Sequence, residues 1–212
     1  MARVVISRTN MTKLSALLSV LVLVACGGKK EPPAVAIDAA GANALVPADL
    51  KAKIVFEEKS VEEERGRKSK TVYTLAAPKT WTADDKMKMF AKVSPPHEDG
   101  YGNFTDLGLG SNCDGRCESK DWAKVSEKVD FAQFRTGYKI VKDEAKPTSH
   151  LIVATNEDTT YVSYAWWVDG GDHYFTCRAA LQKSFMGDGP DPRAAAPAFE
   201  KACQAVNVKT VD

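Results

Sequence analysis

Cysteine and histidine are the residues of this chain best suited to bind a metal or to form a covalent link, and the chain has five and three of them. Cys113 and Cys117 are separated by three residues, Asp114-Gly115-Arg116. Paired thiolates suit Cu(I), whereas in an oxidising compartment the same two side chains form a disulfide. We favour the disulfide, because the intervening residues are those of an ordinary loop, and keep copper or thiol handling as the alternative.

The alternative has a precedent, because Cys113-x-x-x-Cys117 resembles the copper-binding Cys-x-x-x-Cys of Sco-like proteins. That family also requires a distant histidine, for which His97, His150 and His173 are available. Sco-like proteins place the motif in a thioredoxin-type βαβ setting, which this sequence does not predict. The histidines are far apart and lack the clustered spacing of zinc ligands. We therefore expect no metal and no cofactor.

No catalytic motif stands out elsewhere. A Gly-x-Ser-x-Gly nucleophile elbow is absent, so a hydrolase triad is not predicted. Gly108-Leu109-Gly110 lacks the third glycine and the helix of a dinucleotide-binding loop. Met186–Asp191 contains spaced acidic residues but not the spacing or terminal glutamate of an EF-hand. We assign no catalytic residue and expect a noncatalytic protein, with an unrecognised hydrolase as a third option.

The amino-terminal segment is typical of a secretory signal. Residues 1–13 carry Arg3, Arg8 and Lys13 and no acidic residue, and residues 14–25 are apolar apart from two serines. Twelve helical residues rise about 18 Å, whereas a bilayer core of about 30 Å needs about 20 residues. The segment therefore predicts a cleaved signal, residues 1–25, rather than a membrane span. Met1 and Met11 are both candidate starts.

The signal ends in Leu23-Val24-Ala25-Cys26-Gly27, which over residues 11–28 resembles the lipobox of the bacterial lipoprotein family. This resemblance implies cleavage before Cys26, a diacylglyceryl (palmitate-type) group on its thiol and acylation of the new amino terminus. It further implies a lipid-anchored protein of the bacterial cell envelope, facing the periplasm or the outside. Gly at position 27, in place of Asp, implies sorting to the outer membrane. The membrane is thus one expected partner.

Residues 26–48 predict a flexible linker after the lipidated cysteine. They are rich in Pro, Gly and Ala and have few larger aliphatic residues. Residues 49–212 are then expected to form a single domain. Loss of residues 1–25 removes three of 29 basic residues and none of 28 acidic ones, which leaves a net charge of −2. This near-neutral balance argues against nucleic acid as a partner.

The domain is expected to belong to the α+β class, with a mostly antiparallel sheet packed against two or three helices. Hydrophobic alternation predicts the strands, and apolar spacing at i, i+3, i+4 and i+7 predicts the helices. The expected strands include 53–56, 71–75, 87–93, 105–109, 138–142, 151–155, 161–169 and 172–181, and the expected helices are 119–134 and 192–206. Pro197 is expected to delay the start of the second helix.

Gly170-Gly171 between two β-rich runs predicts a hairpin that pairs Tyr164 with Cys177 on a core-facing side. Cys203 lies on the apolar stripe of the 192–206 helix. Of the three connectivities open to Cys113, Cys117, Cys177 and Cys203, these positions favour Cys177–Cys203, which leaves Cys113–Cys117.

Two surface features are candidate contact sites. Trp167 and Tyr174 form a cross-strand pair on the less apolar face of the same hairpin, and they are either a contact surface or covered by the 119–134 helix. A second hairpin turning at Gly66 pairs Glu64 with Lys68 and Glu62 with Lys70. Its tip is a docking element or simply a solvated end, and we favour the solvated end.

The layout of strand, Pro-x-x-Trp, meander and closing helix resembles the PsbP/Mog1-like fold. Tyr73–Trp81 and Phe199–Val206 carry this resemblance, which implies a fold and no site residue. From the anchor, the linker and the absence of a reactive constellation we expect a lipid-anchored envelope module that binds an envelope protein or has a structural role.

Overall fold

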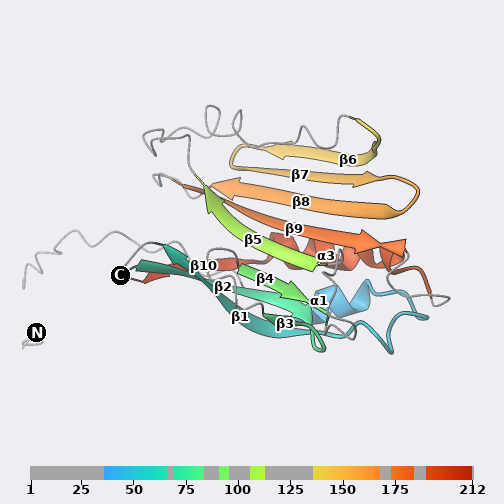
Figure 1. Ribbon diagram of the computed structural model, residues 1–212, viewed down its shortest axis with the longest axis horizontal. Helices are drawn as coiled ribbons and strands as arrows, with labels where there is room; N and C mark the ends of the chain where they lie inside the picture. The colour runs from blue at the N-terminus through green and yellow to red at the C-terminus, as the bar shows by residue number, and fades with distance from the viewer. Residues whose placement is uncertain are drawn as a thin grey trace, which may run out of the picture. The chain divides into compact units, whose positions relative to one another are not determined.

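The structure is a computed structural model that describes residues 36–65, 69–83, 91–95, 106–112, 136–167, 173–183 and 190–211 (Figure 1). All of them belong to one compact unit, Pro33–Asp212. The predicted lipidation site Cys26, the Cys113–Cys117 pair, His97, the 119–134 helix and most of the 186–191 loop lie outside the described residues.

The described strands form two antiparallel sheets. One has the order β1-β2-β10, and the other has the order β3-β4-β5-β9-β8-β7-β6. The expected class, a mostly antiparallel sheet with few helices, is confirmed. The strands are β1 Phe56–Arg65, β2 Ser69–Pro78, β3 Thr82–Ala83, β4 Ala91–Ser94, β5 Asp106–Asn112, β6 Lys139–Lys146, β7 Ser149–Thr155, β8 Thr159–Trp167, β9 Tyr174–Gln182 and β10 Asn207–Val211.

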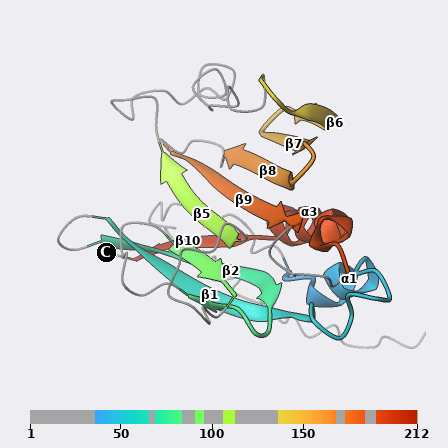
Figure 2. The same ribbon diagram turned by 45° about the vertical axis from the view of Figure 1, so that its right-hand side comes forward.

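Among the described residues, three short helical segments accompany the sheets: α1 Ala39–Ala44, the 3₁₀ turn η3 Pro192–Ala195 and α3 Ala196–Gln204. Helix α3 packs against β8 and β9 on one side and against α1 and β2 on the other, as the turned view in Figure 2 also shows. Its Phe199 ring lies 5.1 Å from the ring of Phe56 and 5.4 Å from that of Trp81. One continuous core therefore joins α3 to both sheets.

The β8–β9 hairpin has the predicted register. Tyr164 pairs with Cys177, Trp166 with Phe175 and Trp167 with Tyr174. The predicted core-facing side is also confirmed, because Phe175, Cys177 and Ala179 are buried in the core.

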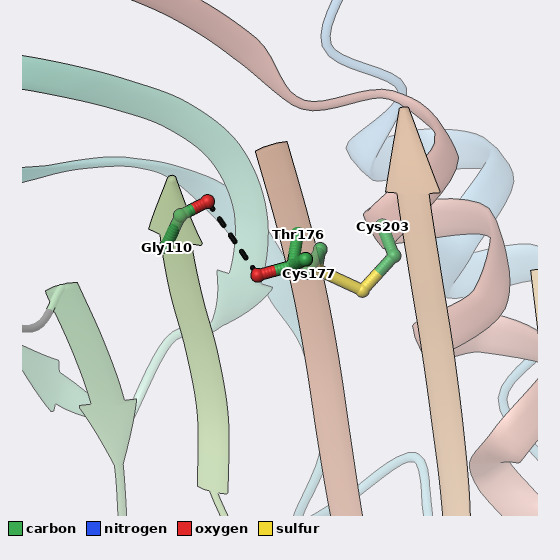
Figure 3. Close-up of a disulfide and its surroundings, with 4 residues drawn as sticks. All are labelled: Gly110, Thr176, Cys177 and Cys203. Carbon is green, nitrogen blue, oxygen red and sulfur yellow. Dashed lines mark hydrogen bonds between the residues drawn. A yellow bond between two sulfur atoms is a disulfide. The ribbon is translucent and has the colours of Figure 1, made fainter. Parts of the chain in front are cut away.

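The Cys177–Cys203 disulfide that this register predicts is present, with Cα atoms 5.4 Å apart (Figure 3). It ties β9 to α3. On the other side of β9, the Thr176 hydroxyl donates a 3.5 Å hydrogen bond to the Gly110 carbonyl of β5. Strand β9 is therefore linked both to the helix and to the neighbouring strand.

The β1–β2 hairpin is present, but its expected register is wrong. Glu64 pairs with Lys70 and Glu62 with Val72, because the strands pair up to Arg65 and Ser69 and so place the turn one residue later. The Glu62–Lys70 ion pair still forms, at 2.7 Å between Oε1 and Nζ. It is a diagonal contact on one face of the hairpin, which the length of the lysine side chain allows.

The predicted linker 26–48 extends too far along the chain. Its last part contains α1, whose amino-terminal Asp38 accepts a 2.7 Å hydrogen bond from the Gly41 amide. Ala42 and Val46 are buried in the core, next to Leu50. The folded region therefore begins before residue 49, because α1 packs against α3 and buries Ala42 in the core.

The carboxyl-terminal region differs from the predicted 192–206 helix in two ways. A 3₁₀ turn precedes α3, which begins one residue before Pro197, as expected for a proline in the first turn. The chain then forms β10, which the sequence did not predict. Strand β10 pairs with β2, with Val208 opposite Tyr73.

Candidate functional site

Strand register brings the ends of several strands to one end of the folded unit, which we call the loop end. Arg65 and Ser69 flank the β1–β2 turn, and Val211 pairs with Lys70 beside it. Asn112, the last residue of β5, pairs with Tyr174, the first residue after the β8–β9 turn. The loop end is thus defined by Glu62–Arg65, Ser69–Lys70, Ser111–Asn112, Trp167, Tyr174 and Thr210–Val211.

A buried carboxylate joins the two sheets just beneath the loop end. Glu63 of β1 is only 8% exposed, an unusual position for an acidic side chain. Its Oε2 accepts a 2.6 Å hydrogen bond from the Tyr73 hydroxyl of β2 and a 3.0 Å hydrogen bond from the Ser111 hydroxyl of β5. These bonds compensate for the loss of water around the carboxylate and fix β5 against the hairpin.

The surroundings of Glu63 are mostly apolar. The rings of Tyr73 and Phe175 lie 6.4 Å apart in an edge-to-face arrangement. Thr71, opposite Glu63, is fully buried, and its hydroxyl has no hydrogen-bond partner among the described residues. With one carboxylate and two hydroxyl donors already bonded to it, this cluster has the composition of a structural clamp rather than of an acid–base pair.

The Trp167–Tyr174 pair lies at the loop end but is not exposed. The two residues are 8% and 5% exposed. Of the two alternatives that the sequence left open, this burial fits a covered pair and does not fit an exposed aromatic contact surface. The residues of the predicted covering helix, 119–134, lie outside the described residues.

The cysteine motif follows directly on the loop end, because Cys113 is the residue after Asn112. Among the described residues no group of three His, Cys, Asp or Glu side chains is arranged to hold a metal ion. His150 instead contacts Asp143 at 2.7 Å between Nε2 and Oδ1, on the paired strands β7 and β6. His173 directly precedes β9.

The opposite end of β1 holds α1. The side-chain amide of Asn43 donates to the Phe56 carbonyl at 2.9 Å and accepts from the Phe56 amide at 2.7 Å, so it closes onto the first residue of β1. The Asp38 carboxylate forms an ion pair with Lys201 of α3, at 3.1 Å between Oδ2 and Nζ. The hydrogen bond from the Gly41 backbone amide lowers the pKa of Asp38 most, and the hydrogen bond from Lys201 lowers it further. At about 3.3 Å per residue, the ten residues of β1 separate this end from the loop end by about 30 Å.

In the part of the chain that the structure describes, no helix is long and apolar enough to cross a membrane. Comparisons of the chain with models of known protein families and with curated proteins found no match.

Proposed function

We propose that this chain is a lipid-anchored, noncatalytic binding module of the bacterial cell envelope, attached to the outer membrane through acyl groups on Cys26. In this proposal the loop end binds an envelope protein. The observation that carries it is the placement of the two ends: the described chain begins at α1, and the ends of β1, β2 and β5 come together at the far end of β1. An anchor at one end leaves the other free to meet a partner.

Several features support a binding role. Loops on a rigid scaffold are common positions for binding residues. The Glu63 clamp and the Cys177–Cys203 disulfide provide such a scaffold beneath and beside the loop end. The disulfide also suits an oxidising compartment outside the cytoplasm, in agreement with the proposed export.

Position-specific photocrosslinking in cells tests this proposal. A photoreactive amino acid replaces Glu64 or Thr210, two exposed residues of the loop end, and matched control variants carry it at Ala52 or Thr80 near α1. We expect both loop-end positions to capture the same envelope protein and the control positions not to capture it. No product from either loop-end position, or the same product from all four, would contradict the proposed binding site.

The alternative function is copper or thiol handling by Cys113 and Cys117. Its support is the position of this motif in the sequence, directly after the loop end. A count of free thiols in the native, air-purified protein separates the two functions. A binding module with two disulfides has none, whereas two free thiols that are titrated by Cu(I) would favour the alternative.

A further inference from the structure

Four large apolar residues are exposed among the described residues, and they form two pairs. Ile140 and Val141 lie on the edge strand β6, at 41% and 55% exposed. Leu45 and Val55, each 46% exposed, lie close to where the chain enters the fold. The second pair is the one whose position suggests a specific occupant.

Hydrogen bonds bring the segments of this second pair together. Leu45 is the carboxyl-terminal cap of α1, two residues after Asn43, and Val55 precedes Phe56. The two Asn43–Phe56 bonds therefore place the end of α1 beside the start of β1.

The same region is basic. Lys79 donates its backbone amide to the Val55 carbonyl at 2.7 Å, so the turn after β2 lies beside the start of β1. Lys51 and Lys53 are in the turn between α1 and β1, and all three lysines are exposed. Asp49 is the one acidic residue within 45–55 and 79–80. We define the anchor face as Leu45, Lys51, Lys53, Val55 and Lys79.

The anchor face is also within reach of the predicted lipid. Only nine residues, and so ten Cα–Cα steps, separate Cys26 from Ala36, where the described chain begins. Ten such steps span at most about 36 Å when fully extended, and about 16–19 Å on average for a random coil. A link of that length allows the residues around α1, which packs on α3, to reach the membrane surface when Cys26 is inserted in it.

We propose that the anchor face rests on the membrane, with Leu45 and Val55 in the headgroup region and the three lysines on anionic lipid phosphates. This inference rests on the proposed lipid anchor and adds an orientation to it. Exposed apolar side chains bordered by lysines are suited to such an interface, where apolar burial and attraction to anionic lipid act together. The docked domain presents its loop end away from the bilayer.

Amide hydrogen exchange of the mature acylated protein, residues 26–212, tests this contact. The protein is reconstituted in vesicles of phosphatidylethanolamine with phosphatidylglycerol, and separately in vesicles of phosphatidylcholine alone. We expect several-fold slower exchange at residues 44–55 and 79–80 in the anionic vesicles, with no change at residues 62–72. About 1 M salt shortens the electrostatic screening length to about 3 Å and should remove most of the difference.

Paired variants identify the residues responsible. Leu45→Ser with Val55→Ser, and separately Lys51→Glu with Lys53→Glu, should abolish the slowing. Ile140→Ser with Val141→Ser, and Lys139→Glu with Lys146→Glu, alter matched exposed residues on β6 and should keep it. Equal unfolding midpoints show that the variants fold alike.

The outcomes separate this inference from the proposed function. Equal exchange in the two kinds of vesicle would overturn the proposed membrane contact of the anchor face. Equal slowing in the anchor-face variants and the β6 variants would overturn it as well. Neither result would bear on the proposed lipid anchor. An intact mass that shows an unmodified Cys26 overturns the lipid anchor itself. In that case, sedimentation of the full-length chain with the same vesicles decides whether the anchor face binds lipid unaided.

Discussion

Glu63 shows how one residue can hold the two sheets together. Its Oε2 accepts hydrogen bonds from both Tyr73 and Ser111, so replacement by alanine removes one acceptor from two donors and leaves a cavity. We expect Glu63→Ala to lower the free energy of unfolding by about 2–4 kcal/mol, because buried polar groups that lose a partner cost about 1–3 kcal/mol each. Urea denaturation near neutral pH measures this change.

Two further variants make the Glu63 prediction specific. Glu63→Gln keeps an oxygen acceptor and should lose about half as much stability as the alanine variant. Glu62→Ala removes the exposed ion pair with Lys70 and should cost less than about 1 kcal/mol. If Glu63→Ala cost no more than Glu62→Ala, the clamp would have no structural role.

The Glu63 clamp also shows the limit of sequence analysis at the scale of a residue. In the sequence, Glu63 stands within a run of three glutamates that predicts a solvated hairpin end. Strand alternation places Glu62 and Glu64 outside and Glu63 inside. The position of Glu63 two residues after the apolar Val61 is the sequence feature that places both side chains on the same face of the strand. Ser111, the hydrogen-bond partner of Glu63, is 48 residues away, and no local pattern indicates that contact.

Among the elements, β9 and α3 depend on their disulfide. The chain-entropy estimate for a link across 26 residues is about 3.5 kcal/mol. We expect the double variant Cys177→Ala, Cys203→Ala to lose about that much stability in urea denaturation. A reductant should then destabilise the wild-type protein far more than the double variant. An equal effect on both proteins would assign the sensitivity to the other cysteines.

A second element, the 3₁₀ turn η3, is capped by the Asp191 carboxylate, and the pKa of this group makes its contribution to the stability of the fold depend on pH. The Arg193 guanidinium donates hydrogen bonds to Asp191, the nearest at 2.6 Å, and chiefly for that reason lowers the Asp191 pKa below its ordinary value of 3.8. A lowered pKa in the folded state gives stability that is fully present above 3.8 and is lost as the pH falls through the folded-state pKa. Asp191→Asn should therefore destabilise the protein near neutral pH, by an amount that shrinks in acid.

Arg193 provides the control for this pH dependence. It also donates to the carbonyls of Asn156 and Glu157 in the β7–β8 turn, at 3.2 and 2.5 Å. Arg193→Gln should therefore remove most of the acid-sensitive part, because only the bond from the residue-193 backbone amide to Asp191 is kept, and in addition a part that does not depend on pH. Urea denaturation at several pH values measures both parts, and a constant difference between wild type and Asp191→Asn would contradict the assignment.

The elements that the sequence predicted well are those whose information is local. Gly170-Gly171 between two alternating runs fixes the β8–β9 register, and with it the position of Cys177 relative to α3. Strand β10 was missed because its partner β2 lies more than 130 residues earlier and its five residues have no strong pattern. Helix α1 was missed because its Ala-rich composition resembles a linker, and its burial depends on contacts with α3 and β1.

In the folded molecule, the candidate site is defined by the separation of the loop end from α1, which lie at opposite ends of β1. The sequence predicts the anchor and the cysteine motif separately. It does not predict that α1 begins the fold at one end of β1 while Ser111, just before Cys113, lies at the other. The Asn43–Phe56 and Glu63–Ser111 contacts establish that relation. The proposed binding surface and the proposed anchor therefore lie at opposite ends only because of the tertiary structure.

Both proposals depend on the processing of the precursor, which the sequence alone predicts. Native protein extracted from membranes should lack residues 1–25 and should carry a diacylglyceryl group on Cys26 and an amino-terminal acyl chain. Several chains are needed for stable attachment, because each buried methylene contributes only about 0.8 kcal/mol. Intact mass measurement followed by peptide mapping detects these modifications.

Cys26→Ser is the decisive variant, because it removes the thiol that accepts the lipid and changes no residue of the described structure. It should accumulate as the uncleaved precursor without added acyl mass, while its folded part unfolds at the same urea concentration as the wild-type protein. Equal processing of Cys26→Ser and wild type would mean that another residue, or none, receives the lipid. A lower unfolding midpoint would instead mean that the segment around residue 26 contributes to the stability of the fold and is not a flexible linker.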